Sequence, residues 1–281
     1  MDIYEEIVRV RFEGDKAALA TIVRRQGSTP RKDFAKMLIS EDGSTIGSVG
    51  GGKTEAEVLK EAKRVMETGE ASLLQYQLTP KDAEEDGLTC GGTVEVFVEP
   101  ILPDPKLILM GAGHIGQTVA QAAHRVGFKV AVVDDRETFA NRERFPQAEE
   151  IVVAPFLEGL KTITVSSTSF ILIATRGHGH DQTVLEEALQ TSACYIGMVG
   201  SRRKTQIIVQ NLLGKGISPE ALSRLYAPIG IEIGSETPEE IALSVVAELI
   251  AMLRGVHYRS EKQRFVMNLL EKAKTQAEVK V

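Results

Sequence analysis

Two glycine-rich stretches have the residue types and spacing that could hold a phosphate. Residues 47–54 read GSVGGGKT and fit the P-loop pattern, in which backbone amides and a lysine surround the phosphates of a nucleotide. Residues 111–116 read GAGHIG, the pattern of a dinucleotide-binding turn. Asp134 follows 23 positions after Gly111, where such sites place an acid that accepts hydrogen bonds from ribose hydroxyls. The nearby Arg136 would instead favour a ribose with a 2′-phosphate.

Two basic stretches are candidates for contacting an anion. Residues 175–181 read TRGHGHD, in which Arg176 and His178 could contact an anion. The two histidines of this stretch could also bind a metal ion, although the sequence shows no third and fourth ligand. The alternative for Asp181 is that it caps the N-terminus of a helix. Residues 200–205 read GSRRKT, where a serine cap, the helix dipole and three cations favour a phosphate. The alternative there is a solvated basic first turn.

Cys90, which Gly91 and Gly92 follow, is the candidate for thiolate chemistry. A thiol beside two glycines is accessible to a ligand, and neighbouring amides favour its thiolate form. The alternative is a small buried residue at the start of a strand. Cys194 lies in an apolar run, so we expect it to pack in the core. Two thiols so far apart offer neither zinc spacing nor a disulfide framework.

The second half of the chain alternates apolar runs with helical segments, which predicts a doubly wound parallel sheet of the Rossmann type. The predicted strands are 106–110, 129–133, 151–153, 170–174 and 193–198. The glycine pattern follows the first of these strands and opens a helix, as a dinucleotide site requires. Ligands of such sheets bind beyond the carboxyl ends of the strands. The residues that we expect to contact a ligand there are Gly111, Gly113, His114, Gly116, Asp134, Arg176, His178, Ser201, Arg202 and Arg203.

The first half has a mixed pattern that predicts a smaller α+β domain. We expect helices at 2–12 and 55–68, a strand at 17–24, a hairpin that turns at Asp42 and Gly43, and a strand at 93–99. The P-loop match therefore follows a hairpin arm and not a buried parallel strand, and no strand of this half ends in an acid that could bind Mg²⁺. This context argues against ATP hydrolysis. A tight turn before a helix, or a turn that binds another anion, remains open.

The domain limits follow from three prolines within residues 100–105, which deny both helix and central strand. We expect an N-terminal domain at 1–99, a linker at 100–105, a Rossmann-like domain at 106–255 and a helical tail at 256–281. A capping box at 237–240, with proline in the first helical position, predicts a helix through Leu253. We also expect a homodimer, with the tail helix as one candidate for its interface.

Composition excludes several classes of function. The 281 residues carry a net charge of -6 and only 5% aromatics, which argues against nucleic acid as a partner. The first residues lack the apolar stretch of a signal peptide, and no run approaches the roughly 18 apolar residues of a membrane span. The sequence therefore predicts a cytoplasmic protein that does not bind a membrane.

Ten motifs, in order, resemble the XdhC/CoxI family. They are GSTPRK (27–32), AKM (35–37), DGSTIGSVGGG (42–52), CGGTVEVFVEP (90–100), GAGHIG (111–116), DDR (134–136), ATRGHGHD (174–181), YIGMVGSRRK (195–204), APIGIEIG (227–234) and TPEEIALSVVAEL (237–249). The resemblance spans about residues 10–255. Phe34 stands where the family often has glycine, and Lys53 and Thr54 stand where it has a less polar pair. This second departure creates the P-loop spelling.

The resemblance implies an accessory protein of xanthine dehydrogenase and related molybdenum hydroxylases, and not an enzyme. Such a protein binds the molybdenum cofactor (molybdopterin), protects it and helps its sulfurated form to enter the apo-enzyme, with a cysteine desulfurase as a further partner. Cys90 would hold the molybdenum. The other residues that the resemblance brings to the cofactor are Gly91, Gly92, Arg31, Lys32, Gly50, Gly51 and Gly52. The alternative function is an NAD(P)-dependent oxidoreductase that uses the GAGHIG turn.

Overall fold

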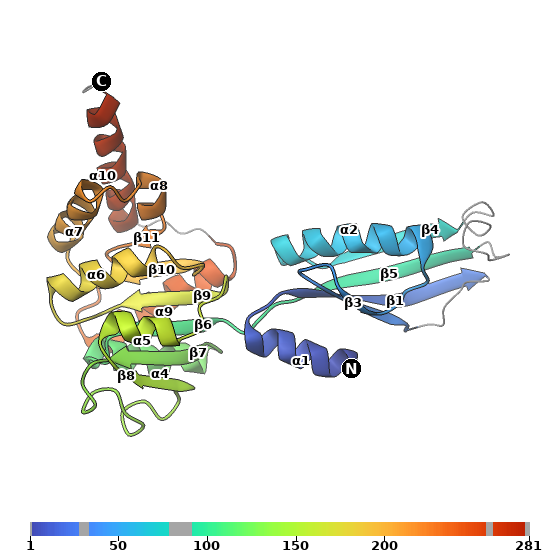
Figure 1. Cartoon of the computed structure of the whole chain (residues 1–281), viewed down its shortest axis with the longest axis horizontal. Coiled ribbons are helices and arrows are strands. Elements are labelled where there is room, and N and C mark those ends of the chain that lie inside the picture. The colour runs from blue at the N-terminus through green and yellow to red at the C-terminus, as the bar shows by residue number, and fades with distance from the viewer. Residues whose placement is uncertain (1, 28–33, 79–91, 257–260, 279–281) are drawn as a thin grey trace. The chain divides into compact units, whose positions relative to one another are not determined.

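The computed structural model describes residues 2–27, 34–78, 92–256 and 261–278, and the chain divides into two compact units, Met1–Asp104 and Pro105–Val281 (Figure 1). The boundary lies inside the predicted linker. The finer division, with a separate linker and tail, stays a proposal.

The first unit is an antiparallel five-stranded sheet in the order β3-β2-β1-β5-β4. Its strands are β1 (Ala17–Gly27), β2 (Lys36–Ser40), β3 (Thr45–Gly47), β4 (Ser72–Leu78) and β5 (Gly92–Ile101). Helices α1 (Ile3–Glu13) and α2 (Gly52–Thr68) cover opposite faces of this sheet (Figure 1). This arrangement follows from alternation along β1, where Ala18 and Ala20 point toward the α2 side and Ala17 and Leu19 toward the α1 side. The predicted α+β fold is confirmed.

Pro100 lies inside β5, although the sequence predicted that the prolines exclude a central strand. It pairs with Ala18 of β1 on one side. On the other side, the pairing with β4 ends where Ser72 meets Val98. At Pro100 one edge of β5 is therefore open, and a residue without an N–H is tolerated there.

The second unit is a parallel six-stranded sheet in the order β11-β10-β9-β6-β7-β8. Its strands are β6 (Lys106–Met110), β7 (Lys129–Asp134), β8 (Glu150–Val153), β9 (Ser169–Ile173), β10 (Tyr195–Met198) and β11 (Leu225–Tyr226). This is the strand order of the dinucleotide-binding doubly wound fold, in which the order of the strands reverses between β6 and β9. The predicted Rossmann-like fold is confirmed.

Helices cover both faces of this sheet. They are α4 (His114–Arg125), α5 (Phe156–Thr162), α6 (His178–Ala188), α7 (Arg202–Gly214), α8 (Pro219–Leu222), α9 (Pro238–Leu253) and α10 (Glu261–Glu278). Alternate residues of β6 belong to the two cores, with Ile108 and Met110 on the α6 side and Leu107 and Leu109 on the α4 and α9 side. None of the helices in the described part of the chain has the length and apolar character to cross a membrane.

Helix α9 begins as the sequence predicts. Thr237 is its N-cap, Pro238 its first residue, and Glu240 completes the capping box. The carboxylate of Glu240 accepts the N–H groups of Glu236 and Thr237, at 2.7 and 3.1 Å. The box satisfies donors that a helix start otherwise leaves without partners.

Candidate functional site

The carboxyl ends of β6 and β9 lie side by side where the strand order reverses, and crevices at this point bind ligands in open α/β sheets. Two glycines of the turn after β6 are required by the backbone. Gly111 has a φ of +125°, and a Cβ there would lie 2.3 Å from the carbonyl oxygen of Ala174. A Cβ at Gly116 would lie 2.3 Å from the carbonyl oxygen of Gly111. Strand, turn and helix therefore pack as closely as the glycine pattern predicts.

Gly113 differs from the other two glycines. It is the N-cap of α4 without a side-chain cap, and a Cβ there would meet no atom within 4 Å. The space before the first turn of α4 is open, so the first amides of the helix can bind an anion. His114 begins the helix and is exposed. Gly113 and His114 thus border the crevice, whereas Gly111 and Gly116 shape the turn.

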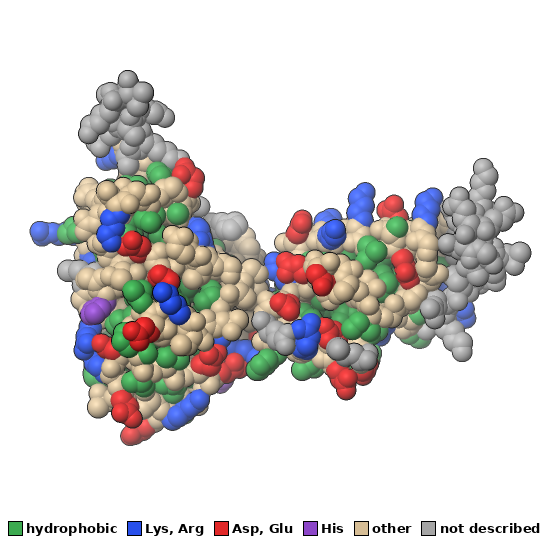
Figure 2. All heavy atoms as spheres, viewed as in Figure 1, with side chains coloured by type: hydrophobic (Ala, Val, Ile, Leu, Met, Phe, Trp, Pro, Cys, Tyr) green, Lys and Arg blue, Asp and Glu red, His purple; other side chains and the backbone are tan. Residues whose placement is uncertain are grey.

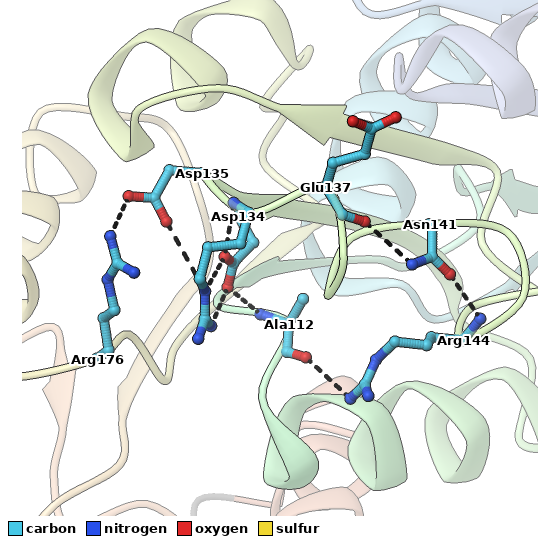
Figure 3. Close-up of polar contacts among 8 residues, drawn as sticks. Ala112, Asp134, Asp135, Glu137, Asn141, Arg144 and Arg176 are labelled. Carbon is cyan, nitrogen blue, oxygen red and sulfur yellow. Dashed lines mark hydrogen bonds and ion pairs between the residues drawn. The ribbon is translucent and has the colours of Figure 1, made fainter.

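Asp134 is fully buried beneath this turn. Its Oδ2 accepts the N–H of Ala112 at 2.8 Å (Figure 3), and its Oδ1 accepts the N–H of Arg136 at 3.1 Å. The guanidinium of Arg136 donates to both oxygens, at 2.8 and 2.9 Å. Burial alone would raise the pKa of Asp134, but the hydrogen bonds from Arg136 and Ala112 outweigh it and keep the pKa below its ordinary value. A ribose contact, as predicted from the sequence, would require Arg136 to move.

Asp135 connects two neighbouring turns at the same edge of the sheet. Its Oδ2 accepts a hydrogen bond from Arg176 at 2.6 Å (Figure 3). Its Oδ1 lies 3.9 Å from Nε of Arg136. Arg176 is 51% exposed and lies beside the crevice. The sequence prediction missed Asp135, although its position directly after Asp134 at the end of a strand was a usable signal.

Arg144 approaches the turn from the irregular segment after β7. Its guanidinium donates to the carbonyl oxygen of Ala112 at 3.3 Å (Figure 3). The ring of Phe139 lies 3.7 Å from the guanidinium carbon of Arg136 and 5.0 Å from that of Arg144. Such stacking holds both guanidinium groups near the turn. The sequence prediction missed Arg144 because it lies in no motif.

Asp181 does not cap a helix, so that alternative was wrong. The N-cap of α6 is Gly177, and Asp181 lies one turn inside the helix with 0% exposure. Its Oδ1 accepts the N–H and the hydroxyl of Thr175, at 3.2 and 2.7 Å. Its Oδ2 pairs with Nζ of Lys204. The carboxylate therefore joins the TRGHGHD turn to the GSRRK turn. His178 is the first residue of α6, and its side chain is not among those described.

Ser201 caps α7, as predicted. Its hydroxyl accepts the N–H of Lys204 at 3.2 Å. Lys204 turns inward, where its Nζ also donates to the carbonyl oxygen of Val199 at 3.0 Å. Arg202 and Arg203 are exposed. One of the three predicted cations is thus structural, and the other two remain accessible to an anion.

The glycine turn of the first unit faces a carboxylate of its own chain. Glu55 Oε1 accepts the hydroxyl of Ser48 at 2.6 Å and the N–H of Val49 at 3.1 Å. Burial alone would raise the pKa of Glu55, but hydrogen bonds from Ser48 and from the amides of Gly51, Val49 and Gly50 keep it below its ordinary value. The feeding strand β3 pairs antiparallel with β2, unlike the feeding strand of a P-loop. A phosphate at this turn would compete with Glu55.

The remaining predicted contacts lie in or beside segments that the structure does not describe. Arg31, Lys32, Cys90 and Gly91 are outside the described residues. Gly92 begins β5. Within the described residues, no group of three or more His, Cys, Asp or Glu side chains could hold a metal ion.

Cys194 is exposed, so its predicted burial in the core was wrong. Strand β10 begins one residue later, at Tyr195. The thiol of Cys194 donates to the carbonyl oxygen of Ser169 at 3.3 Å.

Comparison with known families identifies the chain. A model described as the XdhC Rossmann domain matches residues 107–249, and one described as the XdhC and CoxI family matches residues 11–77. The chain belongs to the XdhC/CoxI family. The ten ordered motifs thus predicted this family correctly.

Three curated proteins are similar to this chain. An uncharacterized Escherichia coli protein, YqeB, is 35% identical over 89% of this chain, which spans only 46% of that relative's length. A Bacillus subtilis protein described as a probable subunit of xanthine dehydrogenase is 26% identical, over 86% of this chain and 94% of the relative. The molybdenum cofactor insertion chaperone PaoD of Escherichia coli is 22% identical, over 87% of this chain and 86% of the relative.

A crystal structure described as a xanthine dehydrogenase from Bacillus halodurans has the same fold. It covers 94% of this chain and 100% of its own, with 24% sequence identity and a TM-score of 0.51.

Proposed function

We propose that this chain binds the molybdenum cofactor as cargo, protects it and inserts it into a xanthine-dehydrogenase-like apo-enzyme. The observation that carries the proposal is membership of the XdhC/CoxI family together with similarity to a molybdenum cofactor insertion chaperone over 87% of the chain. The Bacillus subtilis relative, whose name links it to xanthine dehydrogenase, supports the same class of client enzyme.

The crevice of the second unit supports binding of an anionic group. The cargo is a pterin that ends in a phosphate, and a phosphate fits the open first turn of α4 in front of Gly113. The guanidinium groups of Arg136, Arg144 and Arg176 lie around the neighbouring turns. Arg202 and Arg203 add exposed positive charge in the first turn of α7, which follows β10 at the same edge of the sheet.

We assign the molybdenum end of the cargo to Cys90, because a thiolate is a soft ligand for a transition metal. A cysteine desulfurase would be the partner that supplies sulfur. The residues proposed to surround the cargo on the first unit are Arg31, Lys32, Gly50, Gly51, Gly52, Gly91 and Gly92. At the three glycines 50–52 the cargo would compete with the carboxylate of Glu55 for the turn amides.

The alternative, hydride transfer with NAD(P), depends on the same turn after β6. Its close packing and its open N-cap support a nucleotide. However, the usual ribose acceptor, Asp134, already accepts hydrogen bonds from Ala112 and Arg136 with both carboxylate oxygens. The geometry therefore favours the cargo proposal over a dehydrogenase.

Co-purification from a cofactor-producing host tests the proposal. We expect molybdenum, measured by elemental analysis, and pterin, measured by the fluorescence of its oxidised form, to purify with the chain. Cys90→Ala should lower the molybdenum content, whereas Cys194→Ala, the matched control at the exposed cysteine, should not. If both variants retain the same amount of molybdenum, Cys90 is not a ligand of the cargo. A chain that purifies without pterin and instead binds and turns over NAD(P) would establish the alternative.

A further inference from the structure

Helix α9 has apolar side chains on its solvent side as well as on its buried side. Leu243 is 63% exposed, Ile250 36% and Leu253 37%. Spacings of seven and three residues place the three side chains on one stripe of the helix. The solvent side of a surface helix normally carries polar residues. This stripe is therefore suited to contact with another protein surface.

A groove runs beside the stripe, between α4 and α9. Its volume is about 440 Å³. Its walls are Thr118, Gln121, Ala122, Arg125 and Val126 from the α4 side, and Glu239, Ala242, Leu243 and Val246 from α9. Val126 is 46% exposed. We call this surface the α9 face. It consists of the exposed side chains of Val126, Leu243, Ile250 and Leu253, and of Val246, which lines the groove and is only 5% exposed. Contiguous exposed apolar surfaces of this kind mark interaction sites.

Charged residues at the two ends of the stripe indicate which partner fits. Glu239 lies in the first turn of α9, and Arg254 is its C-cap. Both are exposed. The neighbouring acid, Glu240, is already used in the capping box. The stripe therefore runs from a negative end, through apolar residues, to a positive end.

The order of residues along the stripe is self-complementary. Glu239 and Arg254 lie at equal sequence distances from the midpoint of Val246 and Ala247, and so do Leu243 and Ile250. An identical helix laid in the opposite direction would therefore place Glu239 opposite Arg254 and Leu243 opposite Ile250, whereas Leu253 would come opposite Glu240. A twofold interface requires this kind of self-complementary surface.

We propose that the α9 face pairs two copies of this chain, with their α9 helices antiparallel about a twofold axis near Val246 and Ala247. Glu239 of one copy then faces Arg254 of the other, and Leu243 faces Ile250. A parallel pair would place Glu239 against Glu239 and align the helix dipoles, so both charge terms favour the antiparallel pair. The groove beside α4 receives apolar side chains of the second copy.

The tail helix, which the sequence offered as a candidate interface, uses its apolar side within its own unit. Val266 is 1% and Leu270 3% exposed, and both lie in the core together with Ile208, Leu212 and Leu222. Of these two helices, α9 with its exposed apolar stripe is the better candidate.

Sedimentation equilibrium of the full chain tests this interface by measuring the dimer dissociation constant. The unaltered chain should be a dimer. Leu243→Glu should raise the dissociation constant at least about tenfold, as expected for an apolar residue at the centre of an interface.

The matched control is Ile207→Glu, because Ile207 is an apolar residue of α7 with 48% exposure outside the α9 face. This control should dimerise like the unaltered chain, and circular dichroism should show that each variant is folded. If Leu243→Glu does not fold, Ile250→Glu is measured in its place.

A charge swap tests the antiparallel arrangement. Glu239→Arg and Arg254→Glu should each weaken the dimer a few-fold, in keeping with exposed ion pairs, and the double variant should restore the unaltered dissociation constant. A chain that is monomeric at every concentration would overturn the proposal. So would a dimer that Leu243→Glu and Ile250→Glu leave unchanged, or a double variant no tighter than the single ones. None of these results depends on the proposed cargo.

Discussion

At the residue scale, Gly111 and Gly113 belong to one turn but differ in what they allow. Gly111→Ala should lower the free energy of unfolding by about 3 kcal/mol or more, because its φ of +125° is strained for alanine and the new Cβ would overlap the carbonyl oxygen of Ala174. Gly113→Ala should change it by less than about 1 kcal/mol, because its φ of -68° suits alanine and the space is open. Denaturant unfolding measures both values. Equal losses would contradict the geometry of this turn.

The carboxylate of Glu55 should stabilise the first unit in a pH-dependent way. Its pKa is lowered in the folded state, so its contribution is present above the unfolded-state pKa of about 4.3 and is lost as the pH falls through the lower folded-state pKa. Glu55→Gln should lower the free energy of unfolding by about 1 kcal/mol at neutral pH and by less in acid. The control is Glu57→Gln, an exposed change on the same helix. A loss that does not vary with pH would argue against the carboxylate as the acceptor of the turn amides.

Asp181 and Lys204 form a buried ion pair, with side chains 0% and 14% exposed. Asp181→Ala should lower the free energy of unfolding by about 3–5 kcal/mol, because the ammonium group of Lys204 would lose its buried partner. Lys204→Met in the same chain should recover part of this loss. A double-mutant cycle in denaturant measures the coupling free energy, and additive effects would show that the two turns are not joined through this pair.

At the scale of elements, the sequence predicted most clearly the segments that have both periodicity and end signals. Helix α9 begins at Pro238 and ends at Leu253, as the sequence predicts from its capping box and its first-position proline. Strands β6 and β7 were found because apolar runs buried on both faces are distinctive. Strand β4 was missed. It is an edge strand in which Leu73 is 60% exposed, so its alternation is weak.

The capping box of α9 should contribute measurably to stability. Thr237→Ala should lower the free energy of unfolding by about 1 kcal/mol, because the hydroxyl of Thr237 accepts the N–H of Glu240 at 3.2 Å. Thr237→Ser keeps the acceptor and serves as the matched control, which should stay within a few tenths of a kcal/mol. Thermal unfolding distinguishes the two. Equal losses of stability in the two variants would mean that the methyl group of Thr237, and not its capping hydroxyl, stabilises the protein.

The candidate site was less predictable than the elements around it. The glycine spacing of the GAGHIG pattern identified Gly111, Gly113 and Gly116 as site residues, because their roles depend on the local backbone. It could not show that Arg136 and the turn amide of Ala112 engage Asp134, since that depends on how two turns meet in space. The same reason explains why the pairing of Asp181 with Lys204, from two separate motifs, was missed.

At the scale of the whole molecule, the two units offer different chemistry. The second unit presents an open helix start with guanidinium groups near it, and the first presents a glycine turn closed by Glu55. On the face that Figure 2 shows, acidic and basic side chains are interspersed over both units and form no continuous basic surface of the kind that nucleic-acid binders carry. A protein that receives and releases a small anionic cargo fits this combination better than a nucleic-acid binder does.

Transfer of cargo tests the central proposal most directly. The cofactor-loaded chain is mixed with a xanthine-dehydrogenase-like apo-enzyme, and the molybdenum and pterin acquired by the apo-enzyme are measured after the two proteins are separated. We expect the apo-enzyme to gain both and to become active faster than with an equal amount of unbound cofactor. A chain that carries no molybdenum or pterin, or that keeps its cargo while the apo-enzyme stays empty and inactive, would contradict the proposal.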